Sequence, residues 1–107
     1  MPSSTDRVFK ALADPTRRAI LERLIRGGEH TVHALTELAG VSQPMVSKHL
    51  LALKRARLVH SRRNGRETHY VSQPVALAPL VDWMNDYGAF WKDRFDRLGE
   101  LLEKMDK

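Results

Sequence analysis

The fold of this chain is decided by residues 31–56, which read TVHALTELAGVSQPMVSKHLLALKRA. Thr31 can cap a helix whose apolar residues recur at helical spacing, and Gly40 ends that helix. Ser42 is a second cap only two residues later, and Pro44 falls in the first turn of a helix that runs to about residue 56. The stretch therefore predicts two short helices joined by a tight turn.

Two short helices with a glycine-containing turn form a helix-turn-helix, whose second helix lies in the DNA major groove in proteins that use it to bind DNA. At about 100° per residue the second helix has two different sides. Its apolar side holds Val46, His49, Leu50 and Leu53. Its outer side is polar and basic except for Leu51, and holds Pro44, Ser47, Lys48, Leu51 and Arg55, with Gln43 at the N-terminal end. A thymine methyl group or a neighbouring element would be the partner of Leu51.

Residues 58–72 predict a β-hairpin directly after this helix. Asn64-Gly65 separates two strand-like runs, and this dipeptide is typical of a two-residue turn in which both positions need a positive φ. The cross-strand pairs in that register are Arg63–Arg66, Arg62–Glu67, His60–His69 and Val59–Tyr70. Arginines gather at the tip, so the hairpin has the character of a wing beside the helix-turn-helix.

Apolar spacing predicts helices on both sides of this unit. Ser4 or Thr5 can cap a first helix, and Asp14 followed by Pro15 starts a second that ends at Gly27-Gly28. A long final helix is expected over about residues 79–105. Its apolar stripe comprises Leu80, Met84, Tyr87, Trp91, Phe95, Leu98, Leu102 and Met105. A small core cannot cover such a stripe, so pairing with a second copy is expected, and packing on its own domain is the alternative.

Length and composition fit one small domain spanning residues 1–107. The chain has 107 residues, of which 42 % are hydrophobic and none is cysteine. Disulfides and thiolate zinc sites are therefore excluded. No apolar run reaches the roughly 18 residues of a membrane span, and the first residues do not form a signal peptide. We therefore expect a cytoplasmic protein without a membrane anchor.

The positive charge is concentrated in the middle of the chain. The net charge is +5, yet residues 42–70 alone carry +6, against +1 before them and −2 after them. Such a patch suits nucleic acid or an anionic membrane surface, and a solubilising face is the plain alternative. Double-stranded DNA fits a helix inserted in a groove better than RNA does.

The chain resembles the ArsR-type winged-helix transcriptional regulators. The matching stretches are Ala11–Arg18 (ALADPTRR), Val41–Leu50 (VSQPMVSKHL) and Arg63–Arg66 (RNGR) with Tyr70, in a region of roughly residues 5–73. The resemblance implies a mainly α fold with a small β-hairpin, a homodimer formed by the N- and C-terminal helices, and repression by blocking promoter access.

Many members of that family sense metals, and this chain departs from both of their common sites. Residues 31–38 contain no Cys-x-Cys pair, and Asp82 is present on the last helix but no histidine follows His69. It is more similar to cysteine-free members with an aromatic-rich last helix. No metal or cofactor is expected, and no effector ligand can be identified from the sequence. His60 and His69 would form a cross-strand pair, but two imidazoles are too few for structural zinc.

Candidate site residues follow from these predictions. Those expected at DNA are Ser42, Gln43, Pro44, Ser47, Lys48, His49, Arg62, Arg63 and Arg66. Ser42 is also a cap. For His49, which lies at the edge of the apolar side, a core or boundary position is favoured and a phosphate contact is the alternative. Those expected at the dimer interface are Met84, Tyr87, Trp91, Phe95 and Leu98. Aromatic residues there could also line a small-molecule pocket.

The function expected is sequence-specific binding of double-stranded DNA by a dimeric repressor on a near-palindromic operator. No nucleophile with a triad-like setting and no glycine-rich phosphate loop is present, so the chain is not expected to be an enzyme. One alternative is a ligand- or metal-responsive sensor with a non-standard site. A winged-helix module that binds protein is the other.

Overall fold

The helix-turn-helix lies at the centre of the computed structural model, which describes residues 3–105. Its helices are α3 (Val32–Ala39) and α4 (Gln43–Arg55). The Thr31 hydroxyl accepts a hydrogen bond from the Ala34 N–H at 3.0 Å, and the Ser42 hydroxyl accepts one from the Met45 N–H at 3.3 Å. Gly40 ends α3 in the left-handed conformation, with φ 68°. Both predicted caps are confirmed.

Two helices precede this unit, α1 (Ser4–Leu12) and α2 (Pro15–Gly27). Asp14 caps α2 as predicted, because its carboxylate accepts a hydrogen bond from the Arg17 N–H at 3.0 Å. The predicted start of α1 is wrong by one residue. Ser3 is its cap, since Ser3 and Asp6 each accept a hydrogen bond from the other's backbone N–H in a capping box.

The core forms where α1, α2, α3, α4 and the base of the hairpin meet. Val46, Leu50 and Leu53, on the predicted apolar side of α4, are fully buried. The other side chains that are at most 2 % exposed are Val8, Ile20, Leu24, Leu35, Leu58 and Val59. Because α4 packs through one side only, its opposite side is left for solvent or a partner.

The sheet has three antiparallel strands, β1 (His30–Thr31), β2 (Val59–Asn64) and β3 (Glu67–Ser72), in the order β1-β3-β2. β1 was not predicted, because a two-residue strand has no alternation to detect. It pairs with β3 and ties the segment before α3 to the hairpin. The wing is therefore joined to the helix-turn-helix at its base by backbone hydrogen bonds.

The predicted register of the hairpin is wrong: the turn lies one residue later than expected, so each residue of β2 pairs two positions further along β3. Asn64 pairs with Glu67, which leaves Gly65 and Arg66 as the two turn residues. Gly65 has φ 65°, whereas neither Asn64 nor Arg66 has a positive φ. A glycine at the first turn position is the pattern of a type II′ turn, which matches the strand twist as well as the expected type I′ turn does. The actual pairs replacing the predicted ones are Arg63–Thr68, Arg62–His69, Ser61–Tyr70, His60–Val71 and Val59–Ser72.

The chain turns from α4 into β2 at Arg57. This residue has φ 63°, the left-handed region that glycine usually occupies after a helix. The Arg57 N–H donates to the Lys54 carbonyl and the Leu58 N–H donates to the Leu53 carbonyl, both at 3.0 Å. These two bonds form a Schellman motif, and they direct Leu58 into the core.

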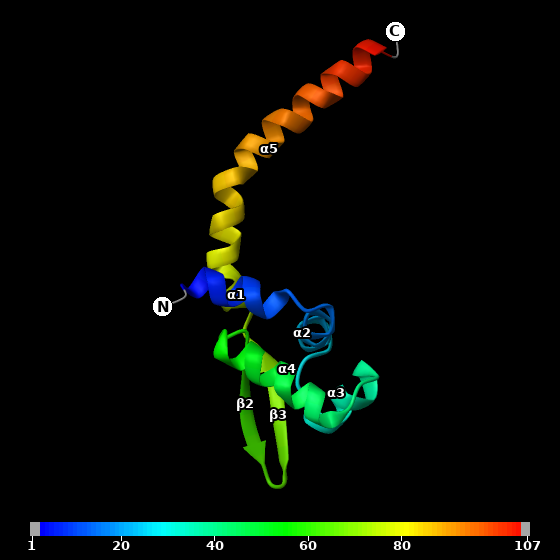
Figure 1. Cartoon of the computed structure of the whole chain (residues 1–107), viewed down its shortest axis with the longest axis vertical. Coiled ribbons are helices and arrows are strands. Elements are labelled where there is room, and N and C mark those ends of the chain that lie inside the picture. The colour runs from blue at the N-terminus through cyan, green and yellow to red at the C-terminus, as the bar shows by residue number, and fades with distance from the viewer. Residues whose placement is uncertain (1–2, 106–107) are drawn as a thin grey trace.

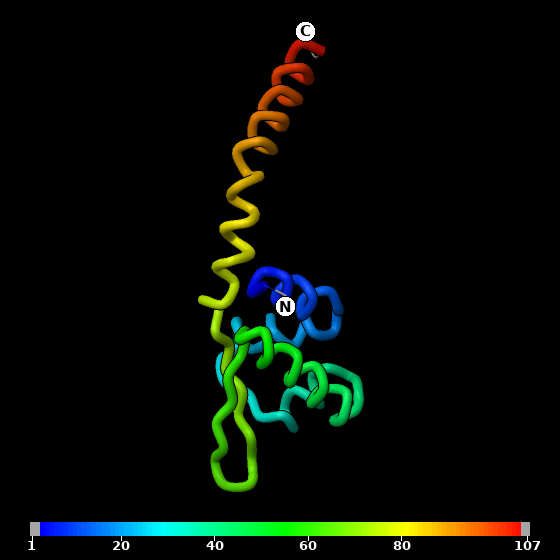
Figure 2. The backbone as a smooth tube through the Cα atoms, turned by 60° about the vertical axis from the view of Figure 1, so that its left-hand side comes forward, coloured from blue at the N-terminus to red at the C-terminus, as the bar shows by residue number. Residues whose placement is uncertain are grey.

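A short helix η1 (Pro74–Leu77) leads into α5 (Ala78–Met105), which continues through Gly88 and Gly99 without a break. α5 is curved and stands away from the rest of the molecule (Figure 1). It and the wing extend in opposite directions, as Figure 2 shows, and the molecule measures 66 × 33 × 20 Å. Within residues 3–105, no helix is long and apolar enough to cross a membrane.

Candidate nucleic-acid interface

The outer side of α4 is exposed along its whole length, as the helical spacing predicts. Its exposed residues are Gln43, Pro44, Ser47, Lys48, Leu51 and Arg55, preceded by the cap Ser42. Leu51 is 45 % exposed although its side chain is apolar. The side that the core leaves free is thus the polar, basic side.

The N-terminal half of α4 and the wing line one shallow cleft of about 350 Å³. Gln43 and Ser47 line it from α4, the hairpin residues 66–68 (Arg66, Glu67 and Thr68) from the wing, and Thr31 from the segment before α3. Side chains that are distant in sequence therefore face the same space. An amide, a hydroxyl and a guanidinium are groups that hydrogen-bond to base edges and phosphates.

Arg63 and Arg66 are exposed at the tip of the wing. The Arg63 Nε donates to the Gly65 carbonyl at 3.4 Å, so its side chain lies over the turn. Arg66 occupies the second turn position. Two of the three arginines predicted at the wing tip are therefore exposed to solvent, and no carboxylate of the described residues pairs with them.

Arg62, the third of these arginines, is held by an ion pair. Its Nε donates to Glu29 Oε1 at 2.7 Å and its Nη2 donates to Glu29 Oε2 at 2.9 Å. The guanidinium lowers the pKa of Glu29, and the carboxylate raises the pKa of Arg62. Arg62 therefore joins the wing to the segment before β1, which weakens the expectation that it contacts DNA. Glu29 carries no sequence signal that could have identified it as a partner.

Two histidines singled out in the sequence occupy protected positions. His49 is only 6 % exposed, and its Nδ1 has no hydrogen-bond partner within the described chain. Its burial favours the core role over a phosphate contact. His69 lies between two carboxylates, with Nδ1 3.9 Å from Glu29 Oε2 and Nε2 3.6 Å from Glu67 Oε2. The predicted His60–His69 pair is wrong, because the register places Val71 opposite His60.

No group of three or more His, Asp or Glu side chains in residues 3–105 is arranged to hold a metal ion. The shifted register separates the two histidines that a cross-strand site would have shared. The geometry of the wing thus gives no support to a metal site between its strands.

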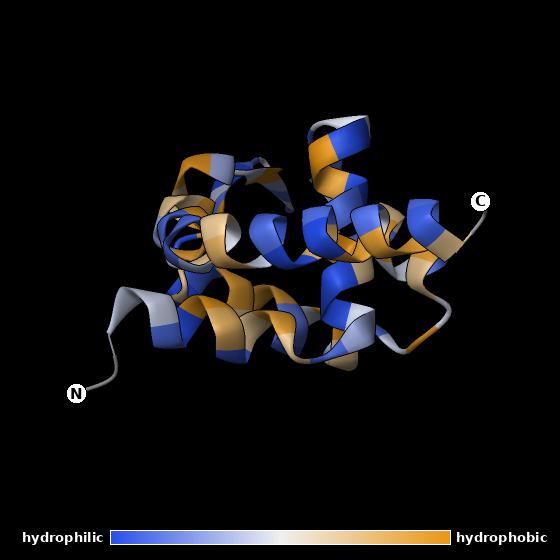
Figure 3. Cartoon of the chain, turned by 90° about the horizontal axis from the view of Figure 1, so that it is seen from above, coloured by the Kyte–Doolittle hydropathy of each residue, from blue (hydrophilic) through white to orange (hydrophobic). Residues whose placement is uncertain are grey.

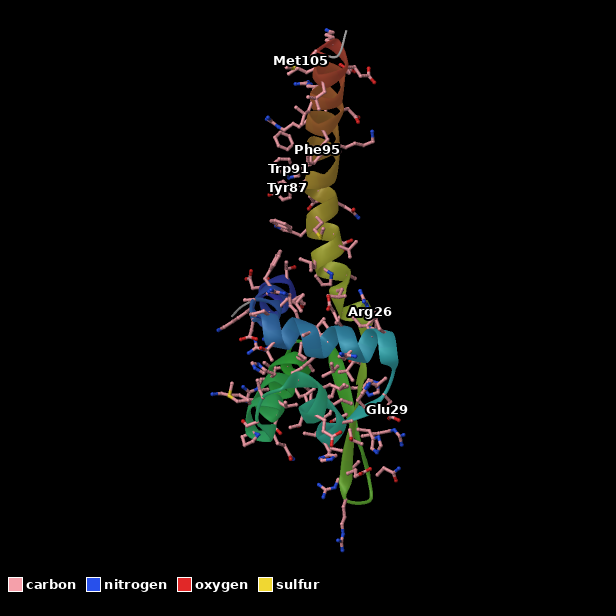
Figure 4. All side chains as sticks on the ribbon, turned by 90° about the vertical axis from the view of Figure 1, so that its right-hand side faces the viewer. Arg26, Glu29, Tyr87, Trp91, Phe95 and Met105 are labelled. Atoms are coloured by element: carbon pink, nitrogen blue, oxygen red, sulfur yellow. The ribbon has the colours of Figure 1, made fainter. Side chains whose placement is uncertain are left out.

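α5 presents a long face of aromatic and aliphatic side chains to solvent. Figure 3 shows hydrophobic and hydrophilic residues alternating along this helix. Tyr87, Trp91 and Phe95 project from the same side of it, along the part of the helix that extends beyond the body of the molecule (Figure 4). The five residues expected at a dimer interface are 49–67 % exposed: Met84, Tyr87, Trp91, Phe95 and Leu98.

This face begins at α1. The rings of Phe9 on α1 and Trp83 on α5 meet edge to face, with centroids 5.1 Å apart, and Trp83 lies 5.0 Å from Tyr87. Further along, the centroids of Trp91 and Phe95 are 6.3 Å apart. The two terminal helices therefore share one aromatic surface, as the predicted fold requires.

Comparison with known proteins identifies the same unit. Residues 14–61 match the family described as bacterial regulatory protein, arsR family. The chain is 42 % identical over 100 residues to the HTH-type transcriptional regulator Rv2034 of Mycobacterium tuberculosis, covering 94 % of this chain and 90 % of that protein. It is 38 % identical over 80 residues to the transcriptional repressor SdpR of Bacillus subtilis, covering 75 % of this chain and 88 % of that protein.

Solved structures show the same architecture. An ArsR-like transcriptional regulator from Rhodococcus sp. RHA1 matches with a TM-score of 0.71 at 32 % identity, and the match covers 92 % of each chain. A homodimeric winged helix-turn-helix DNA-binding domain from Mycobacterium bovis matches with a TM-score of 0.64 at 36 % identity, covering 80 % of this chain and 82 % of that one. The chain therefore belongs to the ArsR family and is a DNA-binding transcriptional regulator with a winged helix-turn-helix.

Proposed function

We propose that this regulator is a dimeric repressor that binds a near-palindromic operator and blocks access to a promoter. The observation that carries the proposal is the cleft shared by Gln43 and Ser47 of α4 and Arg66 of the wing. A helix that enters a major groove and a wing that follows the adjacent backbone must face the same side of the protein. The relative from Bacillus subtilis is named a transcriptional repressor, which supports repression over activation.

Base readout is assigned to the exposed polar residues of α4. Gln43 has an amide that suits adenine, and Lys48 has an ammonium that suits the acceptors of guanine. Ser47 can bond to either. These side chains lie in the first half of the helix, the part that contacts base edges in helix-turn-helix proteins.

Phosphate contacts are assigned to the wing and to the start of α4. Arg63 and Arg66 extend from the wing tip and suit either phosphates or a narrow minor groove. At the start of α4, next to Ser42 and Pro44, the positive end of the helix dipole suits a phosphate. Such contacts fix the position of the protein on the duplex, while sequence preference comes from the helix.

The dimer is assigned to the aromatic face shared by α1 and α5. Burying large apolar side chains such as Trp91 and Phe95 stabilises an association by roughly 25 cal/mol for each Å² removed from water. A two-fold interface on this face buries the same residues from both copies. The two α4 helices then enter successive major grooves about 34 Å apart.

Selection of bound sequences from random DNA duplexes tests this proposal. The expected result is one motif made of two inverted half-sites, with centres about 10 base pairs apart. Enrichment of no motif would contradict the proposal and favour a winged helix that binds protein. A motif with a single half-site would retain DNA readout but contradict the dimer.

A further inference from the structure

A second basic surface lies at the other end of α4, away from the cleft shared with the wing. Four basic side chains, Arg7 and Lys10 of α1, Arg17 of α2 and Arg55 of α4, line a hollow of about 590 Å³. An adjoining hollow of about 270 Å³ shares Arg7 and Arg55 and adds Arg57. We call these two hollows together the α1 groove.

The floor of the α1 groove is made of small residues. Ala11, Ala52 and Ala56 line it between the basic side chains, and each has only a Cβ beyond its backbone. Helices α1 and α4 are therefore separated by a space that no large side chain fills. The side chains of Arg7, Lys10 and Arg55 border this space and are exposed to solvent.

Within the described chain, three cations of the α1 groove have no ion-pair partner, whereas Arg17 helps to lower the pKa of the Asp14 carboxylate. No carboxylate of residues 3–105 lines either hollow, and no described ion pair involves Arg7, Lys10 or Arg55. Arg17 Nη1 donates to the carbonyls of Lys10 and Ala11 at 3.4 and 3.2 Å, while its Nε is buried without a partner. An anion in the groove would be attracted by each of these positive charges.

The backbone conformation of Arg57 is a second observation that supports an anion site. Arg57 has φ 63°, a conformation that a non-glycine residue adopts at a cost in free energy. Glycine would make the same Schellman turn without that cost. The chain places a cation at this position, on the edge of the α1 groove.

We propose that the α1 groove binds phosphates of the DNA backbone, beyond the contacts of the outer side of α4 and the wing. The inference rests on the proposed function. Arg55 lies on the outer side of α4 with Lys48, so the groove continues the surface assigned to DNA. α1 also packs against α5 through Phe9 and Trp83, which places the groove beside the proposed dimer interface. The phosphates it binds are then those near the centre of the operator.

The test compares the salt dependence of DNA binding among three variants of the full chain. The first is Arg7→Gln with Lys10→Gln, whose side chains are both exposed. The second is Arg57→Gly, which removes a cation while relieving the strained backbone, so its melting temperature should not fall. The control is Arg23→Gln with Arg26→Gln, which lowers the net charge by the same amount as the first variant, on α2 outside the groove.

Fluorescence anisotropy with the selected operator and with a random duplex gives the slope of log K against log salt concentration. Removal of one phosphate interaction should reduce that slope by about 0.9. Both groove variants should show this reduction, while the ratio of operator to random affinity stays unchanged because phosphates carry no sequence information. The control should keep the wild-type slope.

Two results would overturn the proposal. The first concerns an operator that the wild type binds specifically. There, either both groove variants keep the wild-type slope, or the control variant shows a reduction of the slope equal to theirs. The other is calorimetric binding of pyrophosphate that Arg7→Gln with Lys10→Gln abolishes while the DNA slope is unchanged, which would make the occupant a small phosphorylated molecule. Enrichment of no motif in the selection experiment would instead contradict the proposed function itself.

Discussion

Glu29 and Arg62 are 33 positions apart in sequence and form a two-pronged ion pair, with N–O distances of 2.7 and 2.9 Å. Glu29 precedes the short strand β1, and Arg62 lies in the first strand of the wing. The pair therefore fixes the wing against the segment that leads into the helix-turn-helix. Because this arginine of the wing is held in an ion pair, it is less available to contact DNA.

The ion pair should respond to acid. Arg62 lowers the pKa of Glu29 from its ordinary value of 4.5, so the stabilisation is fully present above that value and is lost as pH falls through the lower, folded-state pKa. An NMR titration of the Glu29 carboxyl carbon should give a midpoint below 4.5. In Arg62→Ala the midpoint should move upward. An identical midpoint in the two proteins would show that the pair does not form in solution.

Removal of the carboxylate should release Arg62 to DNA. Glu29→Gln takes away one negative charge near the wing and leaves the guanidinium without its partner. The slope of log K against log salt concentration should steepen, by about 0.9 if Arg62 gains one phosphate. Glu22→Gln, an exposed carboxylate on α2, is the control of equal charge. A slope no steeper than that of the control would count against this role.

The wing tip should supply affinity without sequence preference. Arg63→Ala with Arg66→Ala should weaken binding to operator and random duplexes alike and flatten the salt dependence by about 0.9 for each phosphate that is no longer bound. Anisotropy titrations at several salt concentrations measure both effects. Unchanged binding across the titration would remove the wing from the DNA interface. A selective loss at the operator would instead show that the wing reads bases.

Ser42 should have two separable roles. Ser42→Ala removes the cap of α4 and should lower the free energy of unfolding by about 1 kcal/mol, a fall in melting temperature of about 4–8 °C. Ser42→Asp keeps a capping oxygen and should restore stability, yet its charge should repel a phosphate at the helix N-terminus and reduce DNA affinity. Calorimetry and anisotropy on the same samples separate the roles. Equal DNA affinity for wild type and Ser42→Asp would place the phosphate elsewhere.

The aromatic face of α5 should hold the dimer together. Trp91→Asp places a charge in the middle of this face and should release monomers with weak operator affinity, as measured by sedimentation and anisotropy. Val75→Asp is the control for sedimentation, because Val75 is 80 % exposed and lies outside α5. Dimers that persist in Trp91→Asp would place the interface elsewhere. Dissociation of the Val75→Asp control would extend the interface to η1.

Local signals in the sequence were sufficient to predict where helices α2, α3 and α4 begin. Asp14, Thr31 and Ser42 each cap the helix that was expected of them, because a cap acts over only three residues. The split of α4 into a buried and an exposed side followed from helical spacing alone. The hairpin was also expected, but Asn64-Gly65 fits two turns that start one residue apart and shift the pairing by two residues, and the type II′ turn with Gly65 first is the one adopted.

The sequence by itself determined the helix-turn-helix, the wing, the middle cluster of positive charge and the exposed apolar stripe, since each depends on residues that are near neighbours in the chain. Only the tertiary structure decided which arginines are free and which are not. Glu29 reaches Arg62, and Arg7 and Lys10 come beside Arg55, across separations of 33 residues or more. Charge interactions act through space, so their partners are set by how the helices and strands pack.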